Sequence, residues 1–330
     1  MRVSAALPTG VAALFFDSAR ALRRLEGRLV SLVESAGYAE AILPILDYLA
    51  PYESLLTPAS RAELYRFIDR GGEELALRAD FTPLLARLLA PRLASLRLPL
   101  RLFYRGDVVR YGESHPVAQG WRRELYQLGA ELLGAPAADP DADAEREILS
   151  LFLAALAEGD GRKQVVLGLA GCLDAALLAA AGETPVGLAA AVARRDRGVV
   201  RRAGPLLLPI VETGLPARPE DLGAPEAARL RWLLALRDEL AARFPSIDLG
   251  IDLAEFAHYN RHPALAAEGG ARSYYDGLVF RAYAGAGALP VGGGGRYGRL
   301  FRALGADIDA VGFSLSLDSV IEAGRGEGGE

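Results

Sequence analysis

The sequence is poor in the residues that bind metals and form cross-links. Its 330 residues include one cysteine, Cys172, and three histidines, His115, His258 and His262. A single cysteine excludes an internal disulfide, and the scattered histidines lack the spacing of metal ligands. A chain of this length can bury a full hydrophobic core without such cross-links. We therefore expect no metal and no cofactor, and a cytoplasmic protein.

Long apolar runs and positive charge are also scarce. No stretch of about 18 uncharged apolar residues occurs, and the N-terminal residues lack the apolar core and cleavage site of a signal peptide. The formal net charge is -5 and Lys163 is the only lysine. A dedicated nucleic-acid-binding protein normally carries a basic surplus. We therefore expect a protein that binds neither a membrane nor tRNA.

Apolar residues at three- and four-residue steps predict a long helix over residues 17–36. Gly37 stands where a left-handed residue would end it. The proline- and aspartate-rich stretch "GAPAADPDADAERE" ends in acidic residues that predict the start of a second helix through Ile148 and Leu156. Shorter apolar runs predict strands at 74–78, 100–110, 122–134, 274–283 and 310–316. Together they predict an α+β fold with an antiparallel sheet flanked by helices.

The segment "GGGRYG", Gly293 to Gly298, formally satisfies the dinucleotide-binding pattern G-x-G-x-x-G. That pattern requires a parallel strand–helix–strand unit with an acidic residue about 20 positions later. Here the preceding strand ends in "AGAGALP", which is typical of a hairpin, so a tight turn is the better interpretation. A phosphate-binding P-loop is excluded because no G-K-[ST] follows.

Four ordered motifs resemble class II aminoacyl-tRNA synthetases, and histidyl-tRNA synthetase in particular. "GYAEAILPILDY" resembles motif 1, "PLRLFYRGDVVRYGE" with "GWRRELYQLGAELLG" resembles motif 2, "ARSYYDGLVF" resembles the histidine-specific tyrosine motif, and "VGGGGRYGRLFRALG" with "AVGFSLSLDSV" resembles motif 3. The resemblance implies one class II synthetase-like domain over 1–321, with a helical insertion at roughly 183–245 and a polar tail at 322–330. It also implies a homodimer formed through the motif 1 region around Gly37 to Pro44.

The resemblance fails at positions that handle phosphate in the synthetase. Arg110 matches the motif 2 arginine, but the motif 3 arginine is Ser319, and the activating arginine before the tyrosine pair falls on Gly270. Catalysis at a phosphate group depends on fixed positive charge. Loss of one arginine that holds the phosphates lowers the reaction rate roughly 10³-fold or more. We therefore expect amino-acid activation to be lost and no catalytic residues to remain.

The amino-acid pocket of the family is largely retained. Gln127 and Glu131 are four residues apart on a predicted strand, so both side chains lie on one face of the sheet. Without the motif, the same two residues fit a solvated edge strand. The resemblance implies that the histidine-binding candidates are Asp80, Thr82, Arg110, Gln127, Glu131 and Tyr275.

Two features distinguish a relative of the synthetase from the synthetase itself. The segment "LRADFTP" resembles the form found in the synthetase-like regulatory subunit of ATP phosphoribosyltransferase. The chain also stops shortly after motif 3, so we expect no anticodon-binding domain. The resemblance implies a non-catalytic subunit that activates a short-form catalytic phosphoribosyltransferase, in a hetero-oligomer that is a hetero-octamer in the family. This partner catalyses the first step of histidine biosynthesis, and histidine is the implied feedback effector.

The sequence is also compatible with two alternatives. One is a free-standing synthetase-like enzyme that activates an amino acid with ATP, which ATP–pyrophosphate exchange would detect. The other is an RNA-binding relic, suggested by the arginine cluster at 193–202. Asp196 interrupts that cluster and no aromatic residue interleaves with it, so a solvated helix surface is the simpler interpretation.

Overall fold

The computed structural model describes residues 6–52, 61–111, 116–117, 120–135, 143–181, 185–259, 275–285 and 289–326. The helices are α1 (Phe16–Ser35), α3 (Phe81–Leu89), α4 (Ala144–Ala157), α5 (Asp174–Ala181), α6 (Pro185–Ala193), α7 (Arg197–Ala203), α8 (Leu208–Thr213), α9 (Ala224–Arg243), α10 (Gly298–Ala303) and α11 (Leu317–Gly326). None of the helices in these ranges is long and apolar enough to cross a membrane.

Strands form one large sheet and two small ones among the described residues. The large sheet has the order β1 (Ala39–Glu40), β5 (Leu100–Val109), β8 (Glu124–Leu133), β13 (Ala310–Ser316), β12 (Leu289–Arg296), β11 (Leu278–Ala284), β9 (Lys163–Leu169) and β10 (Ile247–Ile251). The small sheets are β2 (Leu46–Tyr48) with β4 (Glu74–Leu77) and β3 (Arg66–Ile68), and β6 (Pro116–Val117) with β7 (Gly120–Trp121).

The large sheet is mixed, whereas the sequence predicted an antiparallel one. Its six inner strands pair antiparallel, as predicted. At the two edges, β1 pairs with β5 and β10 pairs with β9 in parallel. Each edge strand is separated from its partner by a long crossover, which is the kind of connection that parallel pairing requires.

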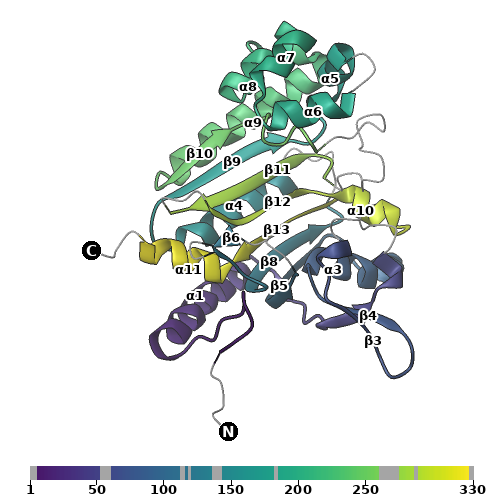
Figure 1. The fold of residues 1–330 in the computed structure, drawn as a ribbon, viewed down its shortest axis with the longest axis vertical. Helices are drawn as coiled ribbons and strands as arrows, with labels where there is room; N and C mark the ends of the chain where they lie inside the picture. The colour runs from purple at the N-terminus through teal and green to yellow at the C-terminus, as the bar shows by residue number, and fades with distance from the viewer. Residues whose placement is uncertain are drawn as a thin grey trace.

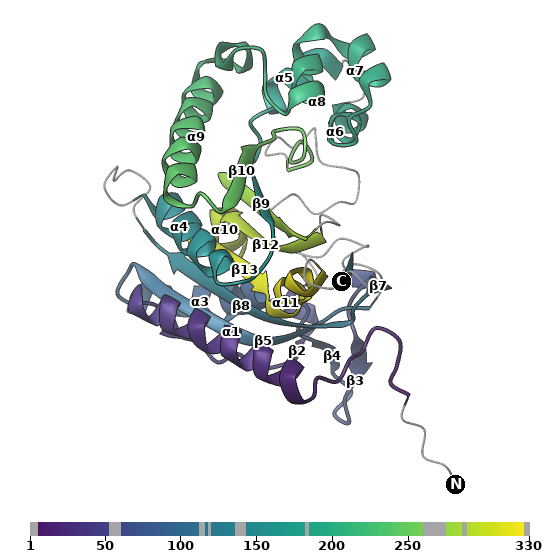
Figure 2. The ribbon, with the colours of Figure 1, turned by 90° about the vertical axis from the view of Figure 1, so that its left-hand side faces the viewer.

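Three helices cover one face of this sheet. In Figure 2, α1, α4 and α9 lie side by side along it, while α5 to α8 extend beyond the sheet at the top. Figure 1 shows the same four short helices as a separate layer above β9 and β10. The main core lies between the sheet and the covering helices, and it includes Leu29, Phe152 and Phe280. The opposite face of the sheet is thereby left to form a site.

The two predicted helices are present with their predicted ends. Helix α1 buries Leu22, Leu25, Leu29 and Val33, and Gly37 follows it with a φ of +84°. The backbone N–H of Tyr38 returns to the carbonyl of Val33 at 3.1 Å, which closes the helix in the manner of a Schellman motif.

Helix α4 begins at an acidic cap. The side chain of Asp143 accepts a hydrogen bond from the backbone N–H of Arg146 at 3.1 Å, and Glu145 and Glu147 lie in the first turn. These carboxylates face the positive end of the helix dipole, as the sequence predicted.

The glycine-rich segment is a strand and not a turn. β12 pairs antiparallel with β11 on one side and with β13 on the other. This placement contradicts the turn interpretation, and it also excludes the parallel unit that dinucleotide binding requires. A side chain at Gly294 would put its Cβ 2.1 Å from the carbonyl oxygen of Gly312. Glycine is therefore required here because neighbouring backbone approaches too closely for any side chain.

Helices fill the chain between β9 and β10, and the last described element is also helical. Helices α6 to α9 lie within the predicted insertion at 183–245, and α5 precedes it. Helix α11 continues to Gly326, so residues 322–326, which we expected in a polar tail, are helical.

Candidate functional site

A cavity of about 420 Å³ opens on the face of the sheet that α1, α4 and α9 leave uncovered. Its floor is formed by β11, β12 and β13, and its walls come from β8, from the start of α3 and from the turn of residues 252–259. Of the predicted histidine-binding residues, Asp80, Arg110, Gln127 and Tyr275 line this cavity. Four residues predicted from distant parts of the chain are thus brought together.

Strand register explains why these residues share one face. One row of paired residues crosses four adjacent strands. It runs from Gly129 of β8 to Ser314 of β13, Gly293 of β12 and Arg281 of β11. Residues directly opposite in antiparallel strands point to the same face. Gln127 is two residues from Gly129, so it lies on that face as well. Gly293 contributes no side chain to the cavity floor, whereas the hydroxyl of Tyr104 lies over Gly129.

Asp80 and Arg110 form a polar pair at one end of the cavity. One oxygen of Asp80 caps α3 by accepting from the backbone N–H of Thr82 at 3.0 Å, and the other lies 3.7 Å from Nη2 of Arg110. Arg110 also donates through Nε to the carbonyl oxygen of Ala79 at 2.9 Å. The loose ion pair leaves a carboxylate and a guanidinium side by side, which is suited to a ligand that carries both charges.

Thr82 and Glu131 do not line the cavity, although the sequence placed them with the other four. Glu131 is 1% exposed and accepts from Thr82 Oγ1 at 2.8 Å and from the hydroxyl of Tyr104 at 3.1 Å. It also accepts from the hydroxyl of Tyr297. Burial raises the pKa of Glu131 to about 7, against the opposing effect of these hydrogen bonds. The carboxylate is therefore enclosed within the fold.

Glycines on both sides make room for this enclosure. A Cβ on Gly129 would lie 2.4 Å from the hydroxyl oxygen of Tyr104, and a Cβ on Gly312 would lie 1.5 Å from Oε2 of Glu131. Tyr104 thus occupies the space above Gly129, and the carboxylate of Glu131 lies flat over Gly312. Tyr297, which follows the glycine run, was missed as a site residue although its motif had been noted.

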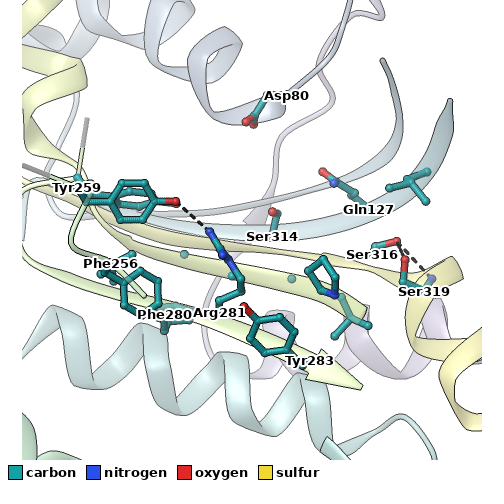
Figure 3. A pocket seen from close by; sticks show the side chains of 18 of the residues that line it. Asp80, Gln127, Phe256, Tyr259, Phe280, Arg281, Tyr283, Ser314, Ser316 and Ser319 are labelled. Carbon is teal, nitrogen blue, oxygen red and sulfur yellow. Dashed lines mark hydrogen bonds between the residues drawn. The ribbon is translucent and has the colours of Figure 1, made fainter. Parts of the chain in front are cut away.

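The other end of the cavity carries hydroxyl groups where the synthetase motif would place positive charge. The Oγ atoms of Ser316 and Ser319 are 2.9 Å apart, and the backbone N–H of Ser319 points to Ser316 Oγ at 3.3 Å. Figure 3 shows this pair at the start of α11, away from Asp80. Gly270, the second position predicted to have lost an arginine, lies outside the described residues, as do His115 and His262.

Arg281 is a cavity residue that the sequence analysis missed. In Figure 3 its guanidinium rises from the floor toward Tyr259, to whose hydroxyl Nη2 donates at 3.1 Å. Nη1 contacts Oε1 of Glu255 at 3.3 Å, and the hydroxyl of Tyr283 donates to the same oxygen at 2.5 Å. Alternation from Tyr275 along the predicted strand could have identified Arg281, because residues two apart share a face. Nothing in the sequence pointed to Glu255 or Tyr259.

We also searched the described residues for a metal-binding site. No group of three or more histidine, cysteine, aspartate or glutamate side chains among them could hold a metal ion. Cys172 is buried and is not part of a disulfide.

The family model for histidyl-tRNA synthetase matches residues 10–206 and 212–320. Two relatives described as ATP phosphoribosyltransferase regulatory subunits are similar over nearly the whole chain. The protein from Moorella thermoacetica is 35% identical, over 97% of this chain and 82% of its own length. The protein from Symbiobacterium thermophilum is 34% identical, over 98% of this chain and 80% of its own length.

Solved structures share the same fold. A regulatory subunit/histidyl-tRNA synthetase from Bacillus halodurans has a TM-score of 0.77 at 24% identity and covers 98% of this chain and 84% of its own. A histidine–tRNA ligase subunit from Alicyclobacillus acidocaldarius has 0.72 at 28% identity and covers all of both chains. An ATP phosphoribosyltransferase complex from Thermotoga maritima has 0.65 at 21% identity, over 90% of this chain and 97% of that one.

The mixed sheet, its helices and the family-model match define a class II synthetase-like protein built on the histidyl-tRNA synthetase fold. Within that class, the chain belongs to the family of ATP phosphoribosyltransferase regulatory subunits. The sequence-based prediction of a non-catalytic regulatory subunit in histidine biosynthesis is therefore confirmed at the level of the family.

Proposed function

We propose that this chain binds a short-form catalytic ATP phosphoribosyltransferase, activates it, and takes part in its feedback inhibition by histidine. One observation carries the effector part of the proposal: Asp80, Arg110, Gln127 and Tyr275 line one cavity, while a serine stands at the motif 3 arginine position. The site thus keeps groups that recognise an amino acid and lacks a group that would activate it. Such a site senses its ligand.

The chemistry of the cavity supports a zwitterionic ligand. The carboxylate of Asp80 can accept from an ammonium group, and the guanidinium of Arg110 can donate to a carboxylate, in charge-assisted hydrogen bonds. Gln127 offers both a donor and an acceptor, and the ring of Tyr275 offers a flat apolar face. We propose that Thr82 and Glu131 support the Asp80 end of the cavity from within the fold. The backbone N–H of Thr82 donates to Asp80, and its hydroxyl donates to Glu131.

An exposed apolar surface supports the proposed homodimer. Ile42 is 89% exposed beside the edge strand β1, and Leu46 and Tyr48 of β2 are 43% and 52% exposed. On β3, at the other edge of the small sheet, Ile68 is 72% exposed. Large apolar side chains left exposed in this region favour an interaction surface. We assign this surface to a second copy of the chain, within a hetero-octamer formed with the catalytic subunit in the cytoplasm.

The Thermotoga maritima complex supports the choice of partner, because one chain of that phosphoribosyltransferase complex shares the fold of this chain. The partner is tested by co-purification from the native cell with this chain as bait, followed by reconstitution. We expect a short-form phosphoribosyltransferase to co-purify and its activity to rise when this chain is added. A catalytic subunit that is fully active alone and unaffected by this chain would contradict the proposal.

The effector role is tested by calorimetry and by inhibition of the reconstituted enzyme. L-Histidine at about 100 times its dissociation constant should raise the stability of this chain by about 2.7 kcal/mol. Gln127→Ala should weaken both histidine binding and inhibition. Gln164→Ala, on an exposed position of β9 outside the cavity, is the matched control and should change neither. If Gln127→Ala leaves inhibition intact, the effector site lies elsewhere.

The enzyme alternative is decided by ATP–pyrophosphate exchange. We expect no histidine-dependent exchange from the wild-type chain, and none from Ser319→Arg alone. Exchange at a rate typical of synthetases would replace the regulatory proposal with the enzymatic one.

A further inference from the structure

The turn of residues 252–259 contacts both the cavity and the helices α6 to α8 with the residues that join and end them, 185–214, which we call the helical region. It follows β10 directly, and Asp252 begins it. One oxygen of Asp252 accepts from the backbone N–H groups of Ala254 and Glu255 at 3.0 and 3.3 Å. This carboxylate therefore fixes the shape of the turn from within.

The helical region holds Asp252 from outside. Arg195, between α6 and α7, forms an ion pair with Asp252 and donates through Nη1 to the carbonyl oxygen of Val211 at 2.7 Å. Arg195 has a φ of +56°, a left-handed conformation that is uncommon for any residue with a Cβ. Strained backbone of this kind persists where surrounding contacts over-determine it, and it concentrates at functional positions.

A second contact joins the same two parts. The backbone N–H of Leu253 donates to the carbonyl oxygen of Gly214, at the end of α8, at 2.7 Å. Gly214 also has a left-handed φ of +85°, and a Cβ there would lie 3.0 Å from Asp252. Arg195 and Gly214, which both have a left-handed backbone, thus hold the first two residues of the turn.

The far end of the turn forms the cavity wall. Phe256 packs over Gly168, where a Cβ would lie 2.2 Å from the ring. The carbonyl oxygen of Tyr259 accepts from the backbone N–H of Gly171 at 2.7 Å, and its ring lies 5.4 Å from that of Tyr275. Arg281 ties Glu255 and Tyr259 to the floor. Movement of the turn would therefore displace Tyr259 relative to Tyr275 and Arg281.

We propose that Arg195 and Asp252 are positioning residues through which the helical region sets the position of this cavity wall. Neither side chain lines the cavity. A partner that moves α6–α8 would change the cavity through this junction, and a ligand in the cavity would act on the helical region by the same contacts, because coupling is reciprocal. The consequence for histidine rests on the proposed function, whereas the mechanical link does not.

The link is tested first without ligand, by hydrogen exchange of the full chain. Arg195→Asn removes the guanidinium and keeps a residue that tolerates the left-handed conformation. Asp252→Asn removes the charge and keeps an oxygen for the turn. Both should accelerate exchange of residues 252–259 by about tenfold, because each removes a charge-assisted contact that opposes local opening of the turn. Arg197→Ala is the matched control, because Arg197 lies two residues away and its contact with Glu212 is a loose 4.0 Å. Unchanged exchange of 252–259 in both variants would overturn the proposal.

The second arm measures L-histidine binding by calorimetry. Arg195→Asn should weaken binding by about fivefold, a usual size for coupling through packed contacts, while Arg197→Ala should not. A looser turn with unchanged histidine affinity would show that the junction is merely structural and would overturn its link to the cavity. If the wild-type chain binds no histidine, the proposed effector site fails instead, and hydrogen exchange alone decides the inference.

Discussion

Two buried glutamates on opposite faces of the sheet experience opposite electrostatic environments. Glu26 of α1 is 3% exposed and Glu131 of β8 is 1% exposed. Burial raises the pKa of both carboxyl groups, yet the net pKa of Glu26 is lowered and that of Glu131 is raised to about 7. Exposure therefore does not determine the charge of a buried acid. The difference must come from its partners.

The partners of the two carboxylates differ in charge. Glu26 accepts from Arg105 at 2.8 Å, from the hydroxyl of Tyr126 at 2.6 Å and from Arg23, so two cations compensate it. Glu131 accepts from the three hydroxyl groups of Thr82, Tyr104 and Tyr297. A buried charge is stable when it is paired with an opposite charge, and hydroxyl dipoles compensate it less. Glu26 thus fastens α1 to the sheet, while Glu131 can titrate near neutral pH beside the proposed effector pocket.

The largest effect should come from filling the space that Glu131 requires. Gly312→Ala would put a Cβ 1.5 Å from Oε2 of Glu131 and 2.8 Å from the carbonyl oxygen of Ala130. Overpacking of this severity should cost about 3 kcal/mol or more of unfolding free energy, measured by urea denaturation. Gly250→Ala in β10 is the control, because its Cβ would meet nothing within 4 Å. Equal stability of the two variants would show that the enclosure of Glu131 is not tight.

The next effect is a pH dependence specific to Glu131. Its pKa is about 7 in the folded state against 4.5 for the free group, so the folded chain binds more protons between these values. Stability contributed by this group therefore falls as pH rises from about 4.5 to 7. Relative to Glu131→Gln, which cannot titrate, the wild type should lose roughly 2.5 kcal/mol between pH 5 and pH 8. Parallel stability curves for the two proteins would contradict this assignment.

The sequence identified the elements that carry both glutamates, and alternation correctly placed Gln127 and Glu131 on one face of β8. It could not show that Gln127 lines the cavity while Glu131 is enclosed in the fold, because this difference depends on glycines that become neighbours only in the folded sheet. Gly312 makes room for the Glu131 carboxylate, and Tyr104 above Gly129 stands between the two side chains. Arg281 was accessible to the same alternation argument. The Arg195–Asp252 ion pair was not, since 57 residues separate its members and no local pattern marks either one.

Glu26→Gln should have a smaller effect with the opposite pH dependence. The substitution removes the charge that Arg23 and Arg105 compensate, but their side chains are 65% and 37% exposed, and solvent screens the loss. We expect a cost of about 1.5 kcal/mol at pH 7. Because the folded pKa of Glu26 is lowered, its contribution is complete above about pH 4.5 and is lost as pH falls through the folded value. Thermal melts from pH 7 to pH 3 should show the difference between variant and wild type shrinking.

The smallest and most discriminating effect compares the tyrosine donors of the two sites. Tyr297→Phe and Tyr126→Phe each delete one hydroxyl that donates to a buried carboxylate, at about 1 kcal/mol each. At Glu131 the lost donor is one of three hydroxyl groups that lower its pKa, so this pKa should rise above 7 and the cost should be larger at pH 8 than at pH 5. At Glu26 the two arginines remain and the carboxylate stays ionised, so the cost of Tyr126→Phe should be constant over that range. Urea denaturation at both pH values measures the contrast. A cost of Tyr297→Phe that is the same at pH 5 and pH 8 would mean that Glu131 keeps one protonation state over this range, which would contradict a folded pKa between these values.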